Sequence, residues 1–146
     1  MASDEIVVLL QTSMAPTVLI SGVGLLLLSM TNRLGRPLDR IRLLTTELRD
    51  SAEDQRKVIA EEIRVLYSRA RLLQTAIVLA TLSITLAAMI IITLFFGGAM
   101  GFPLDGLVEV LFSGSLLALV ASLVVFIEDI RLGLHSIKIE LERWGI

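Results

Sequence analysis

Hydrophobic positions along the chain form three long stretches, separated by polar segments in which apolar residues recur at helical spacing. The middle stretch, residues 72–96, contains no charged residue. At about 1.5 Å per residue, a helix of this length exceeds the ~30 Å hydrocarbon core of a bilayer. The pattern therefore predicts a transmembrane helix that is tilted in the membrane.

Two further spans are predicted on either side of this stretch, at about residues 15–31 and 107–127. Residues 6–10 precede the first span, either as a short helix at the membrane surface or as part of the span itself. In the second case Pro16 kinks the helix, whereas in the first it occupies a first turn, where proline is tolerated. A glycine-containing turn at residues 97–106 joins the second span to the third.

Residues 33–71 show the three- and four-residue steps of amphipathic helices. The repeated apolar positions are Leu38, Ile41, Leu44 and Leu48 in a first arm, and Ile59, Ile63, Leu66, Ala70 and Leu73 in a second. Gly35 and Pro37 predict a kink or break before the first arm. The pattern predicts an antiparallel helical hairpin that turns near residues 50–54, with Ser51 as a plausible start for the second arm.

Residues 128–146 form a predicted C-terminal helix with its own apolar seam of Ile130, Leu134, Ile137, Leu141 and Trp144. This helix either lies on the membrane surface or stands upright against the hairpin. Its length matches that of a hairpin arm, which favours the upright arrangement. The sequence therefore predicts an all-α integral membrane protein, residues 1–146 forming a single membrane domain whose three transmembrane helices continue into a cytoplasmic three-helix bundle.

Basic residues define the predicted orientation. Ten of the thirteen lie within residues 33–71, and the other three follow the third span. Because lysine and arginine accumulate on the cytoplasmic side, the hairpin and the C-terminus are expected inside and the N-terminus outside. The chain begins with acidic residues where a signal peptide is basic, so we expect this segment to be retained.

Composition agrees with a membrane location. Apolar residues make up 55% of the 146 positions and the mean hydropathy is +0.82, above the balance of a soluble domain. The chain has no cysteine, which excludes disulfides and thiolate metal sites.

The polar residues do not form a recognisable catalytic constellation. The single histidine, His135, lies beside the apolar seam of the last helix. Two pairs of carboxylates are each followed within three residues by an arginine, which favours ion pairing over cation binding. These are Glu61 and Glu62 with Arg64, and Glu128 and Asp129 with Arg131. We therefore expect no enzyme, no catalytic residue, no metal site and no cofactor.

A passive cation-conducting pore is the favoured hypothesis, and it requires several copies around an axis because three helices cannot enclose water. Its candidate lining consists of small and hydroxylated residues in the spans: Ser13, Thr17, Ser21, Gly24 and Thr31, and Gln74, Thr81 and Thr85. Its candidate outer ring is acidic, as in cation channels: Asp4, Glu5, Asp105 and Glu109. Arg33, Arg36 and Arg71 are candidates for the inner mouth or for lipid headgroup contacts.

The alternative is a non-catalytic scaffold or anchor whose cytoplasmic helices bind a partner protein. Coupled transport is disfavoured because no span carries an ionisable residue deep in the membrane. The expected partners are membrane lipids, further copies of the chain, monovalent or divalent cations, and a cytoplasmic protein. Nucleic acid is not expected, because acidic residues balance the basic hairpin.

Two stretches at predicted membrane boundaries, LLLLSMTNRLGRPLDRIRLL and RARLLQTAIVLATLSI, resemble an uncharacterised bacterial membrane-protein family, domain of unknown function 2721. The resemblance covers about residues 16–126. It implies a small protein of the bacterial inner membrane, and it supplies no catalytic residues.

Overall fold

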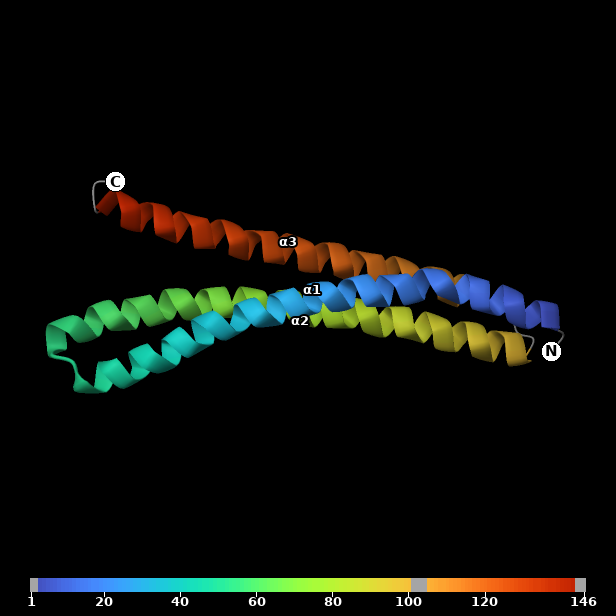
Figure 1. Cartoon of the computed structure of the whole chain (residues 1–146), viewed down its shortest axis with the longest axis horizontal. Helices are drawn as coiled ribbons and strands as arrows, with labels where there is room; N and C mark the ends of the chain where they lie inside the picture. The colour runs from blue at the N-terminus through green and yellow to red at the C-terminus, as the bar shows by residue number, and fades with distance from the viewer. Residues whose placement is uncertain (1–2, 101–104, 144–146) are drawn as a thin grey trace. The chain divides into compact units, whose positions relative to one another are not determined.

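Over residues 3–100 and 105–143, which the computed structural model describes, the chain forms three long α-helices (Figure 1). They are α1 (Ser3–Asp50), α2 (Glu53–Met100) and α3 (Asp105–Arg143). Side chains are described for residues 6–53, 55–97 and 105–133. Each helix contains a stretch long and apolar enough to cross a membrane, which confirms the prediction of an all-helical protein with three candidate spans.

Helix α1 is continuous through both of its prolines. Of the kink or break predicted at Gly35 and Pro37, the break is therefore wrong and the kink stays a prediction. Residues 6–10 belong to the same helix as the first span. Pro16 is buried and Pro37 is half-buried. Proline removes one main-chain hydrogen bond from a helix. Both rings lie on the packed face of α1, so we infer that packing offsets this loss.

The packed face of α1 follows a seven-residue repeat. Its buried and half-buried positions alternate between steps of four and three: Pro16, Ile20, Val23, Leu27, Met30, Leu34, Pro37, Ile41, Leu44 and Leu48. This is the spacing of a coiled-coil helix. Leu38, which the sequence pattern placed on the seam, is instead 40% exposed, because Pro37 and Ile41 occupy the packed positions in this turn of α1.

Helix α2 carries two packed faces, as a helix between two neighbours must. The first continues the predicted hairpin seam: Ile59, Ile63, Leu66, Ala70, Leu73, Ile77, Ala80, Ile84, Ala87, Ile91 and Leu94. The second includes Arg69, Ala76, Ser83, Leu86 and Ile90. Contacts from Arg69 to Asp129 and from Ser83 to Ser115 show that the second face meets α3.

The chain divides into two compact units. Unit 1 comprises Met1–Leu28 and Val78–Ser122, and its α2–α3 contact is built from small residues. Ser83 and Ser115 are completely buried in this contact, and Ala80 and Ala87 are completely buried on the other packed face of α2. The Ser115 hydroxyl donates to the Ser83 carbonyl at 3.0 Å, and the two hydroxyl oxygens lie 3.2 Å apart. Small residues let helices approach closely, which is how helices associate where no hydrophobic effect acts between them.

Replacing Ala87 with leucine is expected to destabilise the folded protein by about 1–3 kcal/mol, because a close-packed seam has no room for three additional carbons. The measurement is unfolding in mixed micelles with increasing dodecyl sulfate, followed by circular dichroism. The same substitution at the exposed Ala121 serves as the control. Equal stability of the two variants would contradict tight packing of this seam.

Unit 2 comprises Ser29–Ile77 and Leu123–Ile146 and contains the predicted hairpin. The turn lies where it was expected, since α1 ends at Asp50 and α2 begins at Glu53. Ser51 does not start the second arm, because its hydroxyl donates back to the Glu47 carbonyl at 2.6 Å. The Ala52 carbonyl instead accepts the first amides of α2, from Gln55 at 3.0 Å and Arg56 at 3.1 Å.

The predicted C-terminal seam is only partly covered by the description. Helix α3 continues to Arg143, in agreement with a helix after the third span. The side chains of Leu134, Ile137 and Leu141, and the whole of Trp144, lie outside the described residues. The upright packing of this helix against the hairpin therefore stays a prediction.

Candidate functional site

A buried carboxylate stands at the charged end of α3. Asp129 is completely buried, whereas its neighbour Glu128 is exposed. Along α3 the buried positions Leu111, Ser115, Ala118 and Ser122 follow steps of four and three, and Asp129 comes seven residues after the last of them. It therefore occupies a position of the packed face, where an ionised group requires partners.

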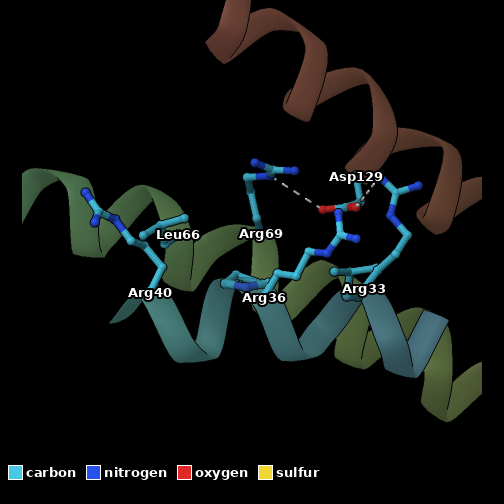
Figure 2. A pocket seen from close by; sticks show the side chains of 8 residues that line it. Arg33, Arg36, Arg40, Leu66, Arg69 and Asp129 are labelled. Atoms are coloured by element: carbon cyan, nitrogen blue, oxygen red, sulfur yellow. Dashed lines mark ion pairs between the residues drawn. The ribbon is translucent and has the colours of Figure 1, made fainter. Parts of the chain in front are cut away.

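Two arginines from the other helices surround this carboxylate (Figure 2). In unit 2, Arg69 of α2 places Nε 3.7 Å from Asp129 Oδ1, and Arg33 of α1 places Nη2 3.9 Å from Oδ2. Arg33 also lies over the ring of Phe126, with its guanidinium carbon 5.3 Å from the ring centroid. This contact is within cation–π range, so one turn of α3 holds Arg33 by two kinds of attraction.

Gly133 provides the space for Arg69. It follows Asp129 by one helical turn, and a Cβ at this position would lie 2.7 Å from Arg69 Nη2. The guanidinium of Arg69 thus lies directly against the α3 backbone. A larger residue at this position would push the guanidinium away from the place where it neutralises Asp129.

A cavity of about 270 Å³ opens beside this ion-pair cluster. Its polar lining consists of four arginines and one aspartate: Arg33, Arg36, Arg40, Arg69 and Asp129. We call this cavity the arginine pocket. Arg33, Arg36 and Arg69 extend toward Asp129, whereas Arg40 lies further along α1 (Figure 2). Four positive charges against one negative charge make the lining strongly cationic.

The hydrogen bonds in the arginine pocket are incomplete. Arg40 is engaged outside it, since both Nε and Nη2 donate to Glu62 Oε1 at 3.2 and 3.0 Å. By contrast, Arg69 Nε and both carboxylate oxygens of Asp129 are buried and make no hydrogen bond to the described residues. Buried polar atoms are nearly always hydrogen-bonded. The unpaired Arg69 Nε is a donor and needs an acceptor, whereas the two oxygens of Asp129 are acceptors whose charge the nearby arginines neutralise.

The sequence analysis found part of this cluster. Arg33 and Arg36 line the pocket, whereas the third candidate, Arg71, is exposed and does not. Arg40, Arg69 and Asp129 were missed as site residues. Glu128 pairs with Arg131 at 3.8 Å as expected, but Asp129 pairs with the other two helices instead. The seven-residue spacing from Ser122 to Asp129 was the available signal.

The candidate pore-lining residues divide between the two units. In unit 1, Ser13 and Gly24 are half-buried, while Thr17, Ser21, Thr81 and Thr85 are exposed. Thr31 and Gln74, both exposed, belong to unit 2. Several hydroxyls donate to the carbonyl four residues earlier, as Thr17 does at 2.7 Å, Ser21 at 3.1 Å and Thr85 at 2.9 Å.

The candidate outer acids are described only in part. Asp105 and Glu109 are exposed in the first turns of α3. Asp4 and Glu5 belong to α1, but their side chains lie outside the described residues. Among the described side chains, no three carboxylates or imidazoles come together in a way that could hold a metal ion. Glu62, one of the paired carboxylates of the hairpin, contacts Arg40 rather than Arg64.

Three helices long and apolar enough to cross a membrane define a multi-pass membrane protein, and its unit 2 contains a cationic pocket. The family described as protein of unknown function (DUF2721) has a model that matches residues 13–139, so the chain belongs to that family. No curated protein and no solved structure matches the chain.

Proposed function

We propose that the protein assembles from several copies in the bacterial inner membrane into a passive pore for cations. The observation that carries the proposal is the placement of exposed hydroxyls in unit 1. Thr17 and Ser21 of α1 are exposed and lie four residues apart, and so do Thr81 and Thr85 of α2. Residues four apart lie on the same face of a helix, so each helix presents a pair of neighbouring hydroxyls.

The hydrogen bonds of these hydroxyls suit a cation. The hydroxyl hydrogens of Thr17, Ser21 and Thr85 are donated to carbonyls of their own helices. The remaining lone pairs of each oxygen are acceptors. Acceptor oxygens replace the water around a cation in a channel. The exposed Asp105 and Glu109 add negative charge in the first turns of α3.

The proposed orientation follows from charge. Arg33, Arg69 and Asp129 meet, so the charged ends of all three apolar stretches lie at the same end of unit 2. The positive-inside rule places that end in the cytoplasm, with the N-terminus outside.

The pore predicts potassium flux from vesicles that contain the purified protein. Replacing both Asp105 with asparagine and Glu109 with glutamine should lower the preference for potassium over chloride by about thirty-fold, since each of the two lost charges removes roughly 1 kcal/mol of attraction at short range in water. Reversal potentials in planar bilayers give this preference. Replacing the exposed Glu53 at the hairpin turn with glutamine is the control and should leave the preference unchanged.

Oligomeric state decides the same question independently. A ring of several copies in nanodiscs agrees with a pore, whereas a monomer, or vesicles that stay tight to potassium, contradicts it.

The second candidate function is a scaffold that binds a partner protein, and exposed apolar side chains of the hairpin favour it. Leu43, Val58, Val65 and Tyr67 are between 51% and 68% exposed in a segment rich in charge. Contiguous exposed apolar patches are typical of protein-binding surfaces. Vesicles that contain the protein and do not release potassium would favour this scaffold function over the pore.

A further inference from the structure

We propose that the arginine pocket binds a phosphate group. The inference is independent of the proposed pore, because it concerns unit 2 alone and requires no second copy. It rests on three observations: a cavity, its excess of positive charge, and the buried Arg69 Nε in its lining, an N–H donor that has no hydrogen-bond acceptor among the described residues.

The charge of the lining selects an anion. Asp129 contacts Arg33 and Arg69, and Arg40 contacts Glu62. Arg36 has no ion pair with any described residue, although it lines the cavity and extends toward Asp129 (Figure 2). After internal pairing, the cluster therefore keeps a net positive charge. A guanidinium presents two parallel N–H groups that match two oxygens of a phosphate, so Arg36 is the residue best placed to bind one.

Asp129 is a positioning residue in this site. Its distances of 3.7 and 3.9 Å to the arginine nitrogens exceed those of hydrogen bonds. The carboxylate thus holds both guanidinium groups near it by charge while leaving their N–H groups available to another acceptor. Gly133 lets the guanidinium of Arg69 lie close to the α3 backbone, because it has no side chain at this position.

The position of the pocket indicates how a phosphate reaches it. No charged residue separates Glu5 from Arg33 in α1, and Arg33 is therefore the first charge after the apolar stretch. A membrane that covers this stretch places Arg33 in the headgroup layer, where lipid phosphates lie. At about 270 Å³, the pocket is at the lower limit of ligand pockets and suits a headgroup or a free phosphate rather than a large ligand.

Native mass spectrometry of the full-length protein in a phosphate-free detergent tests the proposal. The probes are dioleoylphosphatidylglycerol, inorganic phosphate, and dioleoylglycerol, which has the same chains without the phosphate. We expect one bound phosphate group per chain. Replacing Arg36 with glutamine should weaken binding about ten-fold, the equivalent of one charge-assisted contact of roughly 1.4 kcal/mol.

Arg42→Gln is the matched control, because Arg42 lies two residues from the pocket residue Arg40, is exposed, and pairs only weakly with Asp39 at 4.0 Å. Retention of the phospholipid alone identifies a headgroup as the ligand, and retention of inorganic phosphate identifies the free anion; both support the site. Equal losses in the Arg36 and Arg42 variants, equal retention of dioleoylglycerol, or no retention of either phosphate probe would overturn it.

Discussion

Replacing Asp129 with alanine is expected to destabilise the folded protein by about 1–3 kcal/mol, the cost of removing a buried carboxylate from two arginine partners that are themselves partly exposed. The reason is that Arg33 and Arg69 lose the carboxylate that neutralises them. Unfolding in mixed micelles, followed by circular dichroism, measures the loss.

The neighbouring residue provides the control for this prediction. Glu128 is exposed and pairs with Arg131 within the same helix, so its replacement by alanine should cost less than about 1 kcal/mol. A second replacement, Arg69→Met in the Asp129→Ala background, should recover part of the stability because it removes the unneutralised charge. Equal effects at positions 128 and 129, or no recovery in the double variant, would show that the buried pair does not hold unit 2 together.

A single cysteine at position 52 should be labelled only from the cytoplasmic side of the membrane. The chain has no native cysteine, so Ala52→Cys gives one reactive thiol at the exposed turn between α1 and α2. An impermeant maleimide added to intact cells should leave this thiol unmodified and should label it fully once the cells are opened, because ten of the thirteen basic residues lie in the hairpin.

The opposite end of the helices supplies the complementary experiment. A cysteine at position 105, where α3 begins, should react in intact cells. Labelling of position 52 from outside, or equal labelling of both positions before the cells are opened, would reverse or remove the proposed orientation. It would also place the arginine pocket at the outer surface.

The three helices could be predicted from the sequence, because the features that indicate them lie within short segments of the chain. A bilayer requires helices whose main-chain groups bond within each segment, so apolar length alone predicts three of them. The hairpin turn also followed, because charged and polar residues interrupt the apolar repeat near Asp50. The break at Gly35 and Pro37 did not occur, since a proline rule describes an isolated helix whereas Pro37 here lies on a packed face.

The arginine pocket was predicted only in part from the sequence, because it depends on residues that are distant in sequence. Arg33, Arg69 and Asp129 come from three helices, and only their packing brings them together. An arginine near the end of a span satisfies the positive-inside rule whether or not it lines a pocket, so composition cannot separate Arg36 from Arg71. Asp129 was recognisable in principle, as a charge on the small-residue face of α3, but a neighbouring arginine in sequence offered a simpler partner.

The seven-residue repeat of α1 also determines a handedness. A straight α-helix has 3.6 residues per turn, so a face that repeats every 3.5 residues drifts slowly around the helix. To remain in contact with a face of the same period on α2, the two helices must wind around each other with a left-handed twist. Within each unit, the α1–α2 pair is therefore expected to form a short segment of left-handed supercoil.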